Sequence, residues 1–144
     1  MGRVERIHLV AEHGGPPVAV EEVAADAGLG LRGDRHHGGE PGGDLTLIEM
    51  DVLERLAADH GLDLTDGTSR RNLVVGGIDL GQLVGRRFRV GRVVCVGEER
   101  CEPCAHLASL TDQVVLRGLV HSGLRATIAE SGVIAVGDVV ELVE

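Results

Sequence analysis

Two of the three cysteines stand three residues apart in the stretch Cys101-Glu102-Pro103-Cys104-Ala105-His106. Pro103 fixes its own φ and disfavours helical angles at Glu102, so the stretch up to Cys104 is predicted to be an ordered turn. Apolar residues at helical spacing then predict a helix over about residues 105–121, with Cys104 at its N-terminus. Unpaired N–H groups and the helix dipole favour an anion there and lower the pKa of a thiol. A thiolate in this place can bind a soft metal or carry a sulfur atom.

Other chemistry for these cysteines has weaker support. A thioredoxin-like redox pair of Cys101 and Cys104 needs a βα unit, which the chain lacks. A zinc site could add His106 and His36, but the sequence has no second C-x-x-C and no regular H-x3–5-H. Three cysteines are too few for a four-cysteine iron–sulfur cluster, and Cys95, between two valines of a strand, is predicted to be a packing residue. No motif supports a Ser–His–Asp hydrolase.

Basic residues gather in three further places: Arg32-Gly33-Asp34-Arg35-His36-His37, Arg70-Arg71-Asn72, and Arg125. All fourteen basic residues are arginines, whose planar fork suits phosphate or carboxylate. The net charge of −9 argues against a general nucleic-acid or membrane-binding surface, so an anion would be held by a local arginine cluster. We expect these clusters and Cys104 to converge on one concave site, since each lies in a loop or at a strand end.

These residues must be positioned by short runs of alternating apolar and polar residues, which glycine turns separate. These runs predict a mostly β, barrel-like fold. The expected strands cover residues 3–10, 18–23, 44–48, 73–75, 87–90, 93–98, 124–129, 133–136 and 139–143. Helices are expected over 49–60 and 105–121, with a single helical turn within 78–84.

Residues 28–43 are predicted to be a long functional loop, rich in glycine, arginine and histidine. Gly28, Gly30 and Gly33 match the dinucleotide pattern G-x-G-x-x-G. That pattern requires a helix to begin on the glycines, and the Asp-Arg-His-His-Gly-Gly that follows does not suit a helix. A Rossmann site is therefore rejected.

The length of 144 residues predicts a single domain over 1–144. No apolar run approaches the roughly 20 residues that span a bilayer, and residues 1–12 lack the apolar core of a signal peptide. With an odd number of cysteines and no disulfide framework, we expect a cytoplasmic protein with no nucleic-acid or membrane partner.

Taken in order, these motifs resemble the MOSC domain family, the molybdenum cofactor sulfurase C-terminal family. The resemblance covers nearly the whole chain. It is carried by Gly33-Asp34-Arg35-His36, Arg70-Arg71-Asn72-Leu73-Val74-Val75, Gly77-Ile78-Asp79-Leu80, Leu83-Val84-Gly85-Arg86-Arg87-Phe88-Arg89-Val90-Gly91, Cys101-Glu102-Pro103-Cys104, Gly123-Leu124-Arg125-Ala126 and Gly132-Val133-Ile134-Ala135-Val136-Gly137-Asp138.

The resemblance implies a closed β-barrel of the pyruvate-kinase barrel type that binds a molybdenum–pterin cofactor, with Cys104 as the sulfur ligand to molybdenum. It implies contacts to the anionic cofactor from Arg35, Arg70, Arg71, Asn72 and Arg125.

The resemblance also suggests a reductase of small N-hydroxylated substrates, served by a separate electron-donor protein. His36 or His106 would supply protons, because an unperturbed histidine titrates near neutrality. The alternative is a sulfur carrier, in which Cys104 receives a persulfide from a sulfur-donor protein and Cys101 resolves it.

Overall fold

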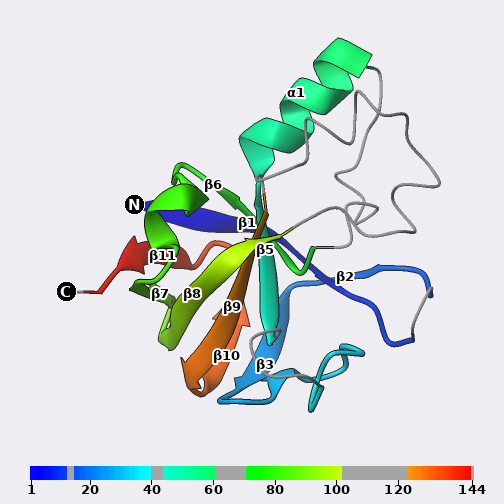
Figure 1. The fold of residues 1–144 in the computed structure, drawn as a ribbon. Coiled ribbons are helices and arrows are strands. Elements are labelled where there is room, and N and C mark those ends of the chain that lie inside the picture. The colour runs from blue at the N-terminus through cyan, green and yellow to red at the C-terminus, as the bar shows by residue number, and fades with distance from the viewer. Residues whose placement is uncertain (13–14, 40–43, 61–70, 102–122, 144) are drawn as a thin grey trace.

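The computed structural model describes residues 1–144 except 13–14, 40–43, 61–70, 102–122 and 144. The elements, shown in Figure 1, are β1 (Gly2–Leu9), β2 (Val18–Val20), β3 (Glu22–Asp26), β4 (Gly30–Leu31), β5 (Leu45–Glu49), α1 (Met50–His60), β6 (Leu73–Gly76), the 3-10 helix η1 (Leu80–Leu83), β7 (Arg87–Val90), β8 (Val93–Cys101), β9 (Gly123–Glu130), β10 (Gly132–Ala135) and β11 (Val139–Leu142). The helix predicted over 105–121 lies outside the described residues.

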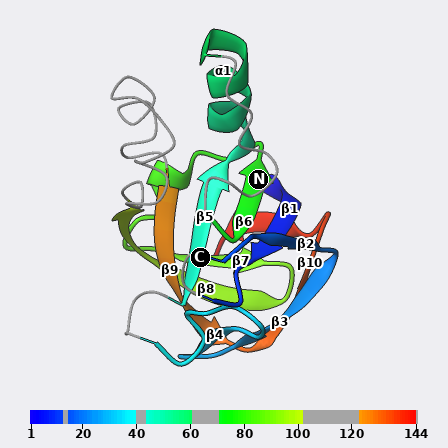
Figure 2. The same cartoon turned by 90° about the vertical axis from the view of Figure 1, so that its right-hand side faces the viewer.

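Seven of these strands form a closed barrel, in the order β1-β11-β7-β8-β9-β5-β6 and back to β1. The ring closes where Gly2 lies opposite Val140 and Arg3 opposite Val139. Closure pairs the strand edges that an open sheet would leave exposed. Figure 2 shows β9, β5 and β6 side by side, with α1 at one end of the barrel. The predicted mostly β, closed-barrel fold is confirmed.

Along a strand, every second side chain points into the barrel, as the alternation of apolar and polar residues predicts. In β7, Phe88 and Val90 are buried while Arg87 and Arg89 are exposed. Phe88 is the only aromatic residue of the chain, so aliphatic side chains make up the rest of the core. Its members include Val4, Ile7, Leu45, Leu47, Leu73, Val75, Val93, Cys95, Leu124, Ile128 and Val140.

A β-bulge in β1 determines which of its residues face the pocket that is described in the next section. Val4 lies opposite Val75 and Arg6 opposite Val74, so Glu5 is an extra residue in β1. Because of this residue Val4 and Ile7, three positions apart, both point into the core. The next residue, His8, then falls on the outer side of the barrel wall.

The prediction of one strand over 18–23 is wrong. The chain changes sheets there: β2 pairs with β1, whereas β3 pairs with β10 and β4 in a separate three-stranded sheet. An alternating pattern gives the period of a strand but not its partner, so it cannot show such a change.

The predicted loop over 28–43 also contains the short strand β4, paired with β3. Gly30 in β4 has φ +124, and a Cβ there would lie 3.0 Å from the Asp44 carbonyl oxygen, so this position requires glycine. No helix begins on the glycines in the described residues 28–39, which agrees with the rejection of a dinucleotide site.

The predicted helix 49–60 is α1, in which Val52 and Leu53 are buried and Asp51 and Arg55 are exposed. The turn predicted within 78–84 is η1, capped by the Asp79 carboxylate, which accepts from the Gly81 N–H at 2.9 Å. Within the described chain, neither helix is both long and apolar enough to cross a bilayer.

Candidate functional site

A small pocket lies where the end of β1, the turn after β4 and the start of β6 meet. Its described lining consists of His8, Val10, Asp34, Arg35, His36, Arg71 and Asn72. The pocket has a volume of about 10 Å³, room for roughly one water molecule. The described residues therefore form a recess against which a larger ligand can rest.

Asp34 holds the turn against the barrel wall from a buried position, with 7% of its surface exposed. Its Oδ1 accepts from the Val10 N–H at 3.0 Å and from Asn72 Nδ2 at 3.3 Å. Its Oδ2 accepts from the His36 N–H at 3.3 Å and lies 3.2 Å from His36 Nδ1. Four polar contacts thus fix one carboxylate.

These contacts keep Asp34 charged. Burial alone would raise the pKa of Asp34, but hydrogen bonds from the His36 side chain and from the Val10 and His36 N–H groups outweigh burial, and the net pKa is lowered. The pocket therefore carries a fixed negative charge at its inner side, opposite the positive charges of Arg35 and Arg71.

Asn72 is the only asparagine of the chain, and it is 6% exposed. Its Oδ1 accepts from Thr46 N–H and Thr46 Oγ1, both at 3.1 Å. Its Nδ2 donates to the His8 carbonyl oxygen at 3.1 Å and to Asp34 Oδ1 at 3.3 Å. An amide side chain has two donor hydrogens and two acceptor lone pairs, so the capacity of Asn72 is fully used inside the protein.

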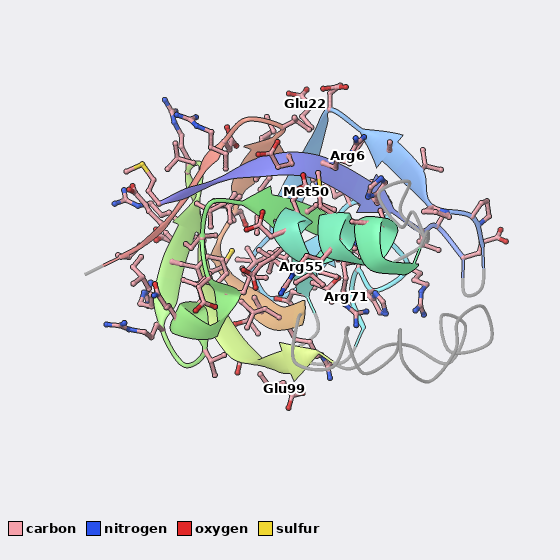
Figure 3. All side chains as sticks on the ribbon, turned by 90° about the horizontal axis from the view of Figure 1, so that it is seen from above. Arg6, Glu22, Met50, Arg55, Arg71 and Glu99 are labelled. Carbon is pink, nitrogen blue, oxygen red and sulfur yellow. The ribbon has the colours of Figure 1, made fainter. Side chains whose placement is uncertain are left out.

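The arginines differ in their placement. Arg71 is buried at 6% exposure, whereas Arg35 is exposed on the turn. Arg125 is half-buried, and its Nη1 donates to Glu99 Oε1 at 3.1 Å. In the view of Figure 3, Arg71 and Glu99 lie on the same side of α1.

Arg125 lies in β9, close to the pocket, but it is not among the residues that line the pocket. It lies opposite Thr46 of β5, and Thr46 in turn bonds to Asn72. Neighbouring strands are about 4.8 Å apart, so two spacings separate Arg125 from Asn72, roughly 10 Å. The structure thus brings Arg35, His36, Arg71 and Asn72 together and places Arg125 nearby.

Arg70, Cys104 and His106 lie outside the described residues. The backbone of Cys101 ends β8 opposite Gly123, the first residue of β9. Gly123 is two positions before Arg125. The described residues on either side of 102–122 therefore lie near Arg125.

Three residues of the site were not singled out from the sequence: His8, Asp34 and Thr46. Asp34 belongs to the cluster Arg32–His37 that the sequence pointed to, but only the structure shows that it is buried and holds the turn against the barrel. His8 could have been noticed as a lone histidine between Ile7 and Leu9 in an apolar strand. The position of His8 in the pocket depends on the β-bulge in β1, and no local sequence pattern predicts that bulge.

Cys95 is a packing residue, as predicted. It is fully buried in β8, and burial together with the negative charge of Asp44 raises the pKa of its thiol to about 12. A thiol in this state is unreactive at neutral pH.

A family model for the MOSC domain matches residues 34–141. The chain belongs to the MOSC domain family. This family is associated with binding of the molybdenum cofactor. The matched segment includes Arg35, His36, Arg71, Asn72, Cys104 and Arg125 but not Arg32 and Gly33.

Solved structures share the fold of this MOSC domain. The YuaD protein from Bacillus subtilis superposes with a TM-score of 0.81 at 17% identity, covering 99% of this chain and 96% of that chain. YiiM from Geobacillus stearothermophilus gives 0.75 at 19% identity, over 100% and 76% of the two chains. YiiM from Escherichia coli gives 0.71 at 18%, over 99% and 70%. Among proteins of curated function, none matches the sequence significantly.

The described pocket of this MOSC domain fits part of such a cofactor. Its two guanidinium groups, on Arg35 and Arg71, suit an anionic phosphate. Among the described residues, no three His, Cys, Asp or Glu side chains are grouped so as to hold a metal ion. The pocket therefore suits the anionic end of such a cofactor, and the predicted metal ligand Cys104 lies outside the described residues.

Proposed function

We propose that this MOSC domain binds a molybdenum–pterin cofactor beside the pocket and reduces small N-hydroxylated compounds, with Cys104 as the metal ligand. The observation that carries the proposal is the convergence of two arginines and a histidine, from motifs far apart in sequence, on one recess of a MOSC fold. The chain has a net charge of −9, so these local cations must outweigh an unfavourable overall field.

Each pocket residue has a distinct task in this proposal. Arg71, buried at the start of β6, would hold the anionic end of the cofactor from the protein side, and Arg35 would hold it from the exposed turn. Asn72 would position these groups and not bind the cofactor, because both ends of its amide already bond within the protein. This refines the sequence-based assignment of Asn72 as a cofactor contact.

The proposed reaction consumes two electrons and two protons: R–NHOH becomes R–NH₂ and water. The bound cofactor would supply the two-electron oxygen-transfer chemistry. Three cysteines are too few for a four-cysteine iron–sulfur cluster, so a separate protein would deliver the electrons. His36, half-exposed at the pocket, would deliver a proton to the departing oxygen.

A second function is favoured by one feature, the spacing of two cysteines three residues apart at 101 and 104. In a sulfur carrier, Cys104 would hold a persulfide, and the Cys101 thiolate would attack its inner sulfur and release the outer one as sulfide, leaving a disulfide. The two functions predict different purified proteins. The reductase contains molybdenum and pterin, whereas the carrier contains sulfur that cyanide removes.

The deciding experiment is to produce the protein in a host that makes the pterin cofactor and to measure molybdenum and pterin per chain after gel filtration. We expect both near one per chain. Arg71→Ala should reduce retention about ten- to a hundredfold, the loss of a charge-assisted pair of roughly 1.5–3 kcal/mol. Arg71→Lys should recover part of it, because an ammonium lacks the planar fork.

Arg55→Ala on the exposed side of α1 is the matched control and should retain the cofactor. Because Arg71 is buried, thermal melts must accompany its variants, and Arg35→Ala tests the same site from an exposed position. Metal-free wild type, or unchanged retention in both Arg71→Ala and Arg35→Ala with intact folds, would show that the cofactor proposal or its placement is wrong.

A further inference from the structure

The two neighbouring histidines of the turn use opposite ring nitrogens. His36 places Nδ1 3.2 Å from Asp34 Oδ2, whereas His37 places Nε2 2.9 Å from Asp26 Oδ2. Their carboxylates also differ, since the side chain of Asp34 is 3% exposed and that of Asp26 is 19% exposed. Asp26 also accepts from Arg32 Nε at 2.8 Å, so His37 belongs to an outer cluster away from the pocket.

The contact with Asp34 determines where His36 carries its proton. A charged carboxylate can only accept hydrogen bonds, so the ring nitrogen facing it must carry hydrogen. Neutral His36 therefore has hydrogen on Nδ1 and a lone pair on Nε2. His36 lines the pocket, and Nε2 is the ring nitrogen left for a ligand there.

Asp34 can impose this arrangement because two groups outside His36 hold its carboxylate. Its Oδ1 is fixed by the Val10 N–H and by Asn72 Nδ2. The Arg35 N–H donates to the Val10 carbonyl at 2.8 Å, which ties the same turn to the end of β1. The residue after β1 and the residue before β6 thus orient the carboxylate independently of the exposed imidazole.

We propose that Asp34, held by Asn72, is a positioning residue that keeps His36 in the Nδ1–H tautomer, so that Nε2 is the atom that accepts and donates protons at this pocket. The part of this inference that concerns proton delivery rests on the proposed reductase function. The tautomer itself does not, since it follows from the protein alone. His8, Arg35 and Arg71 are the other titratable or charged groups that line the pocket with His36 and Asp34.

The test uses the full chain labelled with ¹⁵N-histidine and without added cofactor. Long-range ¹H–¹⁵N correlation spectra, recorded at a pH where histidines are neutral, report which ring nitrogen carries hydrogen. His36→Gln and His37→Gln assign the two signals. We expect His36 as the Nδ1–H tautomer and His37 as the Nε2–H tautomer.

Removing the negative charge should release His36. In Asp34→Asn the His36 tautomer ratio should shift about tenfold toward Nε2–H, which corresponds to roughly 1.4 kcal/mol. Asp26→Asn is the matched control, and it should alter His37 while His36 stays unchanged. The wild-type spectrum decides the question even if Asp34→Asn does not fold.

A wild-type His36 that is mainly Nε2–H, or a folded Asp34→Asn protein with an unchanged His36, would overturn the positioning role. This result is separate from the cofactor proposal. If the purified protein lacks molybdenum but His36 is Nδ1–H, the proposed function fails and the positioning role stands. If the protein holds the cofactor but His36 is Nε2–H, only the positioning role fails.

Discussion

Replacing Asn72 by alanine removes four hydrogen bonds at once. Two bond Oδ1 to Thr46, and two bond Nδ2 to the His8 carbonyl and to Asp34. Each bond contributes about 0.5–1.5 kcal/mol net, and partners left unsatisfied in a buried place cost more than exposed ones. For the four bonds of a residue that is 6% exposed, the sum is about 2–6 kcal/mol, a large part of the roughly 5–15 kcal/mol by which a domain is stable.

Urea unfolding of Asn72→Ala and wild type measures this loss as a difference in the free energy of unfolding. Gln82→Ala, an exposed amide in η1, is the matched control and should cost less than about 0.5 kcal/mol. Asn72→Asp should be no better than alanine, because it replaces the Nδ2 donor beside Asp34 with a second carboxylate oxygen. A loss below about 1 kcal/mol in Asn72→Ala would refute the view that this side chain ties the site to the barrel.

Three further outcomes follow from the structure. Hydrogen bonds lower the pKa of Asp34 in the folded state below its value in the unfolded chain, which is about 4. The charged carboxylate therefore stabilises the fold above about pH 4, and this stabilisation is lost as the pH falls through the folded-state pKa. The difference in unfolding free energy between wild type and Asp34→Asn should therefore shrink below pH 4, as urea titrations at several pH values would show. Glu99→Gln should change stability by less than about 1 kcal/mol, since the pair is exposed, and should raise cofactor retention by freeing Arg125. Cys95 should react with a thiol reagent only after unfolding, which a stopped-flow labelling assay with and without urea would test.

Features set by local patterns could be predicted from the sequence. Alternating residues and a glycine turn predicted the strands over 87–90 and 93–98, and β7 and β8 are paired there as an antiparallel hairpin. Helical spacing of apolar residues predicted α1 to within one residue of its observed start at Met50. The motif around Asp34 and the Arg71–Asn72 pair were recognised as chemically active, and the structure places them side by side.

Features that depend on contacts between distant segments could not be predicted. The extra residue Glu5 in β1 shifts His8 to the outer wall, and it is visible only once β1 is paired with β6. The change of sheet between β2 and β3 likewise depends on which strands become partners. The family resemblance implied that Asn72 contacts the cofactor, but it could not show that the Asn72 amide bonds to three segments of the fold.

The site therefore separates groups that build it from groups that face a ligand. Asn72 and Asp34 bond mainly to the protein, linking β1, β5 and the turn, so their replacement should cost stability first and binding second. Arg35 and His36 are exposed at the pocket, so their replacement should alter binding or proton transfer while the fold persists. Arg71 stands between these classes because it is buried and charged, and for that reason its variants need both a melt and a binding measurement to be understood.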